Sequence, residues 1–132
     1  MPVFHLKDIE GTKFPAGRLT RVLAGPGAPF EPEHFVVGYV TIYPGGSVPG
    51  HTHSQEEIYF IVRGNGVIEI DGEETPVAAD SYAAILPGQK HSLRNAGNKD
   101  LIMLFCYAPK GIVEHWKQEL NQEELQPGER QT

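Results

Sequence analysis

Short hydrophobic runs separated by turn-forming residues fill most of the chain. Fifteen glycines and eleven prolines interrupt the 132 residues at short intervals, and the runs between them are rich in Val, Ile, Tyr and Phe. Several runs alternate apolar and polar positions, which is typical of strands in an all-β sandwich or barrel. We therefore predict strands at residues 34–43, 57–62, 66–71, 74–77, 81–86, 91–95 and 101–108.

Two turn signals are expected to join neighbouring strands as hairpins. Residues 64–66, Gly-Asn-Gly, separate the runs 57–62 and 66–71, and Asp71-Gly72 leads into the next short run. Glycine readily takes the positive φ angles that tight hairpin turns require, and Asn and Asp take them more readily than most residues.

The end of the chain has a different pattern. Residues 111–125 contain helix-forming residues with apolar side chains at helical spacings, which predicts a short amphipathic helix that closes the domain. Repeats, low-complexity tracts and linkers are not evident, so we expect one domain over 1–132 with a core at about 34–108. The apolar positions of the predicted helix are Ile112, Val113, Trp116 and Leu120.

Charge and composition narrow the function. Seventeen acidic and eleven basic residues give a net charge of −6, which disfavours nucleic acid and anionic membranes as partners. The sequence lacks both an apolar stretch of about 20 residues and a secretion signal, so we expect a cytoplasmic protein. The only cysteine, Cys106, lies in the apolar run 101–108, where we expect a small buried hydrophobic residue rather than a disulfide or zinc ligand.

The stretch "PGHTHSQEEIYFIVRG" carries the candidate chemistry. Side chains alternate along an extended chain, so His51 and His53 point to the same side and can bind one ion together. If Glu57 faces inward at the start of the next strand, Tyr59 shares its face. His91, which follows another tight turn, offers a further ligand. A lone His-x-His pair is more often structural, but three imidazoles and one carboxylate suit a transition metal better than Ca or Mg.

Two motifs in this chain resemble the signature motifs of the cupin superfamily. The first is complete: Gly45, five residues, His51-x-His53, three residues, Glu57, six residues and Gly64. The second keeps Gly88, His91 and Asn95 but has Asp80 where the family has glycine, and Leu86 with Pro87 after it where the family has proline. Because aspartate tolerates a left-handed backbone better than most residues, we expect the turn at Asp80 to be kept.

The resemblance implies a fold and a metal site. Cupins form a small jelly-roll barrel, a double-stranded β-helix, so we expect His51, His53, Glu57 and His91 to hold one divalent transition metal (Mn, Fe, Co, Ni, Cu or Zn). Two neighbouring coordination positions would stay open for a chelating ligand. We expect His34, at the start of a strand, to be exposed or capping rather than a fifth ligand.

The resemblance does not identify a reaction. Proteins similar in these motifs include oxalate decarboxylases, dioxygenases, sugar isomerases, uronate ring-opening enzymes and dimethylsulfoniopropionate lyases. One hypothesis is therefore a metalloenzyme that acts on a small oxygenated metabolite, such as a chelating carboxylate, enol or hydroxy-carbonyl compound. The other is a module that binds metal or a metabolite without catalysis.

Two further expectations concern Tyr59 and the assembly. The phenol of Tyr59 could serve as a catalytic proton donor or base, or simply belong to a core aromatic that finds a hydrogen-bond partner. Small cupins commonly pair, so we expect a homodimer, in which residues 3–6 or 20–25 could add a strand to the neighbour's sheet.

Overall fold

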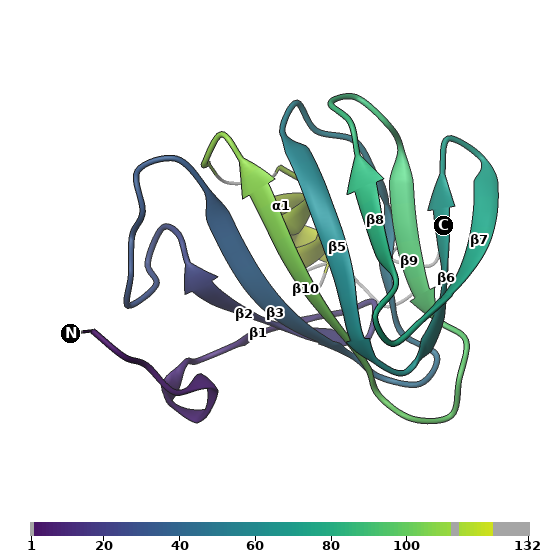
Figure 1. The fold of residues 1–132 in the computed structure, drawn as a ribbon, viewed down its shortest axis with the longest axis horizontal. Helices are drawn as coiled ribbons and strands as arrows, with labels where there is room; N and C mark the ends of the chain where they lie inside the picture. Colours follow the sequence, from purple (N-terminus) through teal and green to yellow (C-terminus); the bar gives the residue numbers. More distant parts are fainter. Residues whose placement is uncertain (1, 112–113, 123–132) are drawn as a thin grey trace.

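The computed structural model describes residues 2–111 and 114–122, and these residues form two antiparallel sheets that face each other (Figure 1). The larger sheet has the strand order β1-β2-β3-β10-β5-β8, and the smaller has the order β4-β9-β6-β7. This arrangement is the all-β jelly roll that the sequence predicts. The strands are β1 (Thr12–Phe14), β2 (Arg18–Ala24), β3 (Val36–Ile42), β4 (Ser47–His51), β5 (Glu56–Arg63), β6 (Asn65–Ile70), β7 (Glu73–Ala78), β8 (Tyr82–Ile85), β9 (His91–Asn95) and β10 (Leu101–Ala108).

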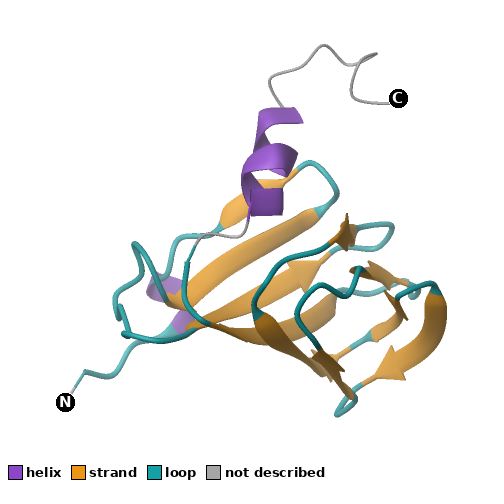
Figure 2. Cartoon of the chain, turned by 90° about the horizontal axis from the view of Figure 1, so that it is seen from above, coloured by secondary structure: helices purple, strands orange, loops and turns teal. Residues whose placement is uncertain are grey.

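One short helix packs against the inner side of the larger sheet. It is α1 (Glu114–Gln122), the longer purple helix beside the strands in Figure 2. The ring of Trp116 lies against those of Phe14 and Phe105, with centroid distances of 6.3 and 5.8 Å. The predicted helix is thus present, whereas residues 112–113 and 123–125 of that prediction lie outside the described residues. A 3-10 helix, η1 (Leu6–Asp8), precedes β1.

None of the helices in the described part of the chain is long and apolar enough to cross a membrane. The cytoplasmic location expected from the sequence stays a prediction.

The alternation along β5 fixes which side chains enter the space between the sheets. Glu57, Tyr59 and Ile61 are buried there, while Ile58 and Phe60 are exposed on the other face. This is the register expected from the sequence. Side chains from both sheets complete the core, among them Val36, Val40, Ile42, Val48, Ile68, Ile85, Leu93, Leu101, Met103, Phe105 and Tyr107.

Residues 64–66 form a crossing between the two sheets, so the predicted hairpin between residues 57–62 and 66–71 is wrong. Strand β5 pairs with β10 and β8, whereas β6 pairs with β7 and β9. At the crossing Gly64 has φ +98°, and an added Cβ would lie 2.8 Å from both the carbonyl oxygen of Asp100 and Cα of Leu101. Glycine is needed here for close packing of the backbone.

The second predicted turn is a true hairpin. Asp71 and Gly72 have φ angles of 50° and 86°, and the flanking residues Ile70 and Glu73 pair between β6 and β7. Two consecutive residues with positive φ are the signature of the tight turn that suits the twist of antiparallel strands.

The N-terminal part of the chain extends the core beyond the expected residues 34–108. Strand β2 pairs with β3 of its own chain, so residues 20–24 are already part of this molecule's larger sheet. Phe14, Arg18 and Thr20 are buried on its inner side. Addition of residues 20–25 to a neighbour's sheet therefore does not describe this structure.

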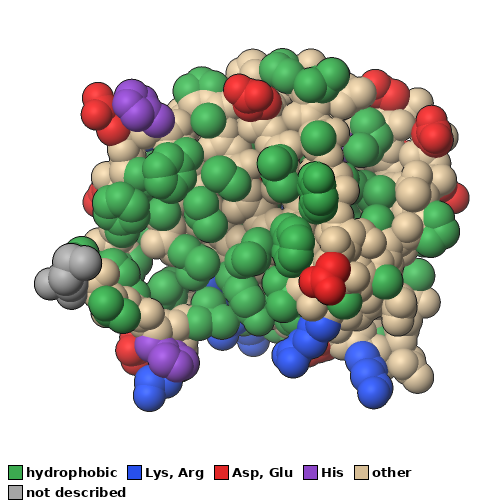
Figure 3. Space-filling model, viewed as in Figure 1, with side chains coloured by type: hydrophobic (Ala, Val, Ile, Leu, Met, Phe, Trp, Pro, Cys, Tyr) green, Lys and Arg blue, Asp and Glu red, His purple; other side chains and the backbone are tan. Residues whose placement is uncertain are grey.

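Cys106 is exposed, so the expectation of a buried cysteine is wrong. Phe105 and Tyr107 point inward from β10, and strand alternation turns Cys106 outward between them. It belongs to a hydrophobic outer face of the larger sheet. Figure 3 shows this face, where hydrophobic side chains gather over β10, β5 and β8.

Candidate metal centre

The fold brings together the four side chains that the sequence singles out. His51 ends β4, His53 lies in the loop that follows, Glu57 lies in β5, and His91 begins β9. His51 and His91 are direct partners across the β4–β9 ladder. One ligand atom from each of the four residues lies within 4.8 Å of the others, which is a spacing that could hold a metal ion.

The three histidines are oriented by the same backbone device. In each, Nδ1 lies 2.8 to 3.0 Å from the carbonyl oxygen of a residue two positions away. A carbonyl can only accept, so Nδ1 carries a proton, which leaves Nε2 as the ring nitrogen available to a metal. Metal-binding histidines are commonly held in this way. The pairs are His51 with Pro49, His53 with Gln55 and His91 with Gln89.

Glu57 is the one carboxylate among the four clustered residues, and it lies close to two of the histidines. Its Oε1 lies 2.9 Å from Nε2 of His53 and 3.3 Å from Nε2 of His91. Burial raises the pKa of Glu57, but the hydrogen bond from His53 and the interaction with His91 outweigh burial and hold this pKa below its usual range. Burial likewise lowers the pKa of His53, and Glu57 reverses the shift and raises it. The hydrogen bond between Nε2 of His53 and Glu57 therefore joins two side chains that a metal cation could bind together.

The Nε2 atom of His91 shows that the cluster fits a metal. His91 is 1% exposed, and among the described residues this nitrogen makes no well-aligned hydrogen bond, although Oε1 of Glu57 lies 3.3 Å away. A poorly paired buried polar atom costs free energy, and a metal ion would give this nitrogen a bond. Three imidazole nitrogens and one carboxylate form a donor set suited to divalent transition metals.

The loop before His91 is fixed to the rest of the site. Asp71 accepts hydrogen bonds from the backbone N–H of Lys90 (3.0 Å) and from the side-chain amide of Gln89 (3.2 Å). The backbone N–H of Gly88 donates to the carbonyl oxygen of His53 (2.9 Å). The turn and the His53 loop therefore hold each other in place.

The departures from the second motif leave its turns intact. Asp80 has φ +73°, so it takes the left-handed conformation as expected. Asn95 supports a loop and does not face the cluster: its amide nitrogen donates to the carbonyl oxygens of Ile42 (2.9 Å) and Lys99 (2.8 Å), and its oxygen accepts from Gly97 N–H (2.8 Å).

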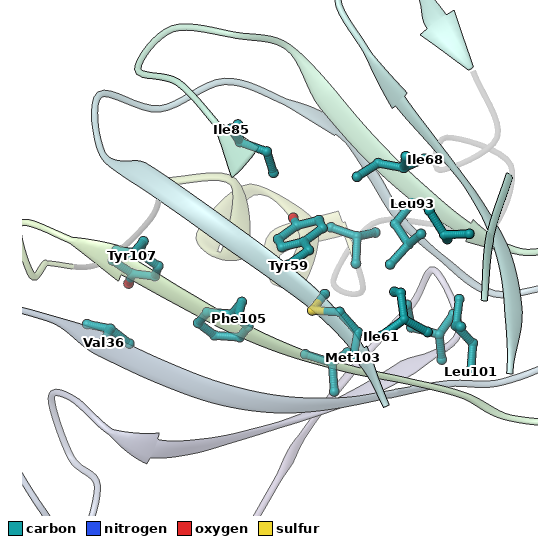
Figure 4. Close-up of a cluster of buried hydrophobic side chains, with 14 residues drawn as sticks. Val36, Tyr59, Ile61, Ile68, Ile85, Leu93, Leu101, Met103, Phe105 and Tyr107 are labelled. Atoms are coloured by element: carbon teal, nitrogen blue, oxygen red, sulfur yellow. The ribbon is translucent and has the colours of Figure 1, made fainter. Parts of the chain in front are cut away.

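An interior cavity adjoins His53 and Glu57. Its volume of about 20 Å³ gives room for about one water molecule. Tyr59 and Phe105 point into this region from β5 and β10 (Figure 4). Burial, followed by the charge of Glu57, raises the pKa of Tyr59 well above its usual range, so this phenol stays protonated. The other lining residues are Arg18, Thr20, Val40, Val48, Met103 and Trp116.

The sequence pattern does not reveal a buried ion pair formed by Arg18 in the wall of this cavity. Arg18 binds Glu119 of α1 through two contacts, Nη1–Oε2 at 2.5 Å and Nη2–Oε1 at 2.8 Å. The pair joins residues 101 positions apart, and no local pattern reports such a contact. In residues 18–24 the leucines at 19 and 23 would be taken for the buried face, yet the structure buries Arg18 and Thr20 instead.

The remaining histidines lie outside the cluster. The side chain of His34 is 81% exposed, as expected. The imidazole of His5 accepts a hydrogen bond from the backbone N–H of Lys7 at the start of η1. Neither residue is among the four that could hold a metal in the described part of the chain.

Comparison with known proteins identifies the family. The family model for the cupin domain matches residues 38–107, which is more than half of the chain and includes all four clustered residues. The chain therefore belongs to the cupin family.

Two characterised relatives and one solved structure illustrate the likeness. The oxalate-binding protein of Thermotoga maritima is 42% identical over 62 residues, covering 46% of this chain and 51% of that protein. The tetracenomycin polyketide synthase protein TcmJ of Streptomyces glaucescens is 30% identical over 94 residues, covering 70% and 62%. The chain thus spans about half to three fifths of these relatives.

The fold likeness extends further than the sequence likeness. A structure described as a predicted oxalate decarboxylase from Thermotoga maritima superposes with a TM-score of 0.71 at 22% identity. The match covers 82% of this chain and 99% of that one. At this identity the superposition supports the cupin fold alone.

Proposed function

We propose that this chain is a metal-dependent cupin enzyme that acts on a small oxygenated metabolite. In this proposal His51, His53, Glu57 and His91 hold one divalent transition metal, drawn from Mn, Fe, Co, Ni, Cu and Zn. The observation that carries the proposal is the shared orientation of the three histidines. Each Nδ1 is held by a backbone carbonyl, and each ring presents a ligand nitrogen to the group that includes the carboxylate of Glu57.

The bound metal would act as a Lewis acid that polarises an oxygen of the substrate. A carboxylate with a neighbouring hydroxyl or carbonyl, an enol or a hydroxy-carbonyl compound offers the oxygen atoms that such an ion binds. The relative named as an oxalate-binding protein supports a small acid. Oxygen consumption and the identity of the product distinguish a dioxygenase from a lyase or an isomerase.

Tyr59 is the proposed catalytic residue, and its environment favours one of its two roles. Tyr59 is 3% exposed and lines the same cavity as His53 and Glu57. Because its raised pKa keeps the proton on oxygen, we assign it the role of donor to a developing negative charge on the substrate rather than that of a base.

A binding module without catalysis is the second candidate. The name of the oxalate-binding relative favours it. The two candidates share the metal site and differ in whether the ligand is returned unchanged.

Turnover by the metal-loaded protein tests the proposal. Oxalate, 2-oxo acids, hydroxy acids and small enols are incubated with the protein loaded in turn with each metal, with and without oxygen, and products are followed by mass spectrometry and an oxygen electrode. Product formation that disappears in His91→Ala and persists in His34→Ala supports the enzyme. Tight binding with the ligand returned unchanged supports the module. Absence of both overturns the two candidates.

For the assembly, we propose a homodimer formed through the outer face of the larger sheet. Hydrophobic side chains gather on this face (Figure 3), and a two-fold axis would place the same patch of both copies in contact. Contiguous exposed apolar surface of this kind commonly marks an interaction site. The large exposed hydrophobic residues of β5, β8 and the turn after β8 are Ile58 (47% exposed), Phe60 (36%), Val62 (38%), Tyr82 (69%) and Leu86 (61%).

A further inference from the structure

Arg18 is a cation held in the wall of the cavity beside the candidate metal centre. Its side chain is 1% exposed, and it lines the same cavity as His53 and Glu57. It also donates to the carbonyl oxygen of Ser47 (3.2 Å) and lies over the ring of Phe14 at 4.1 Å. These contacts fix the guanidinium on β2 with its fork presented to a carboxylate, the group that arginine recognises through two parallel hydrogen bonds.

In this structure that carboxylate belongs to Glu119. It reaches Arg18 from α1, which lies outside both sheets and is nine residues long. A helix of this length has little stability of its own and depends on its packing. The described ring contacts of α1 are those of Trp116 with Phe14 and Phe105. Moving α1 breaks no strand ladder, because the helix takes no part in the pairing of either sheet.

The cavity is small while α1 is in place. Its volume of about 20 Å³ has room for about one water molecule, and even the smallest dicarboxylic acid, with six non-hydrogen atoms, needs more. Trp116 of α1 lines the cavity, so movement of α1 would widen it and at the same time uncover Arg18.

We propose that Arg18 is the binding site for a carboxylate group of the ligand, that Glu119 occupies this site in its absence, and that α1 is the lid which the ligand displaces. The inference deepens the proposed function and rests on it, because it names the ligand as an acid whose carboxylate binds Arg18 beside the metal centre. Exchange of one carboxylate for another leaves Arg18 paired, and Glu119 regains water when α1 moves. The exchange therefore leaves no buried charge without a partner, which would be the costly outcome.

The test is rescue of Glu119→Ala by small carboxylates in the full chain. This variant keeps Arg18 and removes its internal partner, so we expect a lowered melting temperature that millimolar acetate or oxalate raises in a saturable way. Chloride at equal ionic strength should not do so. The double variant Arg18→Met/Glu119→Ala should show no rescue. Glu74→Ala is the matched control, because it breaks the exposed Arg94–Glu74 pair (2.7 Å, both side chains about half exposed) and should not respond to acetate.

Trp116, the only tryptophan of the chain, reports the position of the lid. Oxalate added to the wild-type protein should shift its emission to the red as α1 leaves Phe14 and Phe105. Glu119→Ala should bind oxalate at least about tenfold more tightly than the wild type, because the wild-type site is open only in a minor population. If Glu119→Ala does not fold, Glu119→Gln serves in both measurements.

The outcomes separate this inference from the proposed function. Equal oxalate affinity in the wild type, Glu119→Ala and the double variant, or no carboxylate effect beyond that of chloride, would overturn the role of Arg18 and the lid. Metal content is measured in the same samples. Retained metal without a carboxylate response refutes the lid alone, whereas a carboxylate response in protein that binds no metal supports the lid and refutes the metal centre.

Discussion

Replacing Asn95 with alanine should destabilise the fold without emptying the metal site. Asn95 is 7% exposed and makes three hydrogen bonds, to the carbonyl oxygens of Ile42 and Lys99 and from the N–H of Gly97. A neutral hydrogen bond contributes about 1 kcal/mol net. The bonds to Lys99 and Gly97 are partly buried, so these groups can regain water, whereas the bond to Ile42 is buried.

These contacts set the magnitude of the expected loss. A carbonyl left buried without its partner costs about 1–3 kcal/mol, so the free energy of unfolding should fall by about 3 kcal/mol in total. For a chain of this size that loss lowers the melting temperature by about 10 °C.

Urea and thermal unfolding followed by circular dichroism measure the change. Asn98→Ala is the matched control in the same loop, because Asn98 is exposed, and it should stay within about 0.5 kcal/mol of the wild type. A loss below about 1 kcal/mol for Asn95→Ala would refute the reasoning about its buried bonds. Loss of metal from folded Asn95→Ala would show that the residue acts on the metal site as well.

Three further predictions concern catalysis, assembly and pH. Tyr59→Phe should lower kcat by roughly 10²- to 10⁴-fold with metal content unchanged, because it removes a buried proton donor; a loss below about threefold would leave Tyr59 only a packing role. Ile58→Glu places a charge on the outer face of the larger sheet and should convert the dimer to a monomer, as measured by light scattering at micromolar concentration. A monomeric wild type, or dissociation of the dimer by the control Glu56→Ala, would contradict the proposed interface. Burial lowers the pKa of His53, but the effect of Glu57 is larger and the net pKa is raised, so protons begin to compete with metal for Nε2 at a higher pH than for an ordinary histidine. Metal occupancy after dialysis should therefore fall as the pH drops from 7.5 to about 5.5. Occupancy that is constant over this range would contradict a histidine site.

The part of the site that could be predicted from the sequence rests on short-range patterns. The spacing of His51, His53 and Glu57 lies within one turn and the strand that follows it, where alternation decides which side chains point inward. The turn at Asp80 could also be anticipated locally, because aspartate takes the positive φ angle that this turn requires more readily than most residues.

The parts that could not be predicted depend on which strands pair. Residues 64–66 looked like a hairpin because glycine signals a turn but not the sheet to which the next strand belongs. Cys106 was assigned to the core because strand β10 is apolar on both faces, so hydrophobicity alone could not separate its inner side from its outer side. Arg18 and Glu119 were missed because a buried charge is recognisable only when its distant partner is known.

Metal content of the purified protein tests the central claim most directly. Wild-type protein, His53→Ala, His91→Ala and His34→Ala are loaded with the same metal mixture, dialysed, confirmed as folded by circular dichroism and analysed by elemental mass spectrometry. We expect about one transition ion per chain in the wild type and in His34→Ala, whose imidazole is exposed and outside the cluster. We expect little or none in His53→Ala and His91→Ala, because each lacks one of four ligands. Full occupancy in either of these two variants, or an empty wild type after loading, would contradict the assignment of the metal centre.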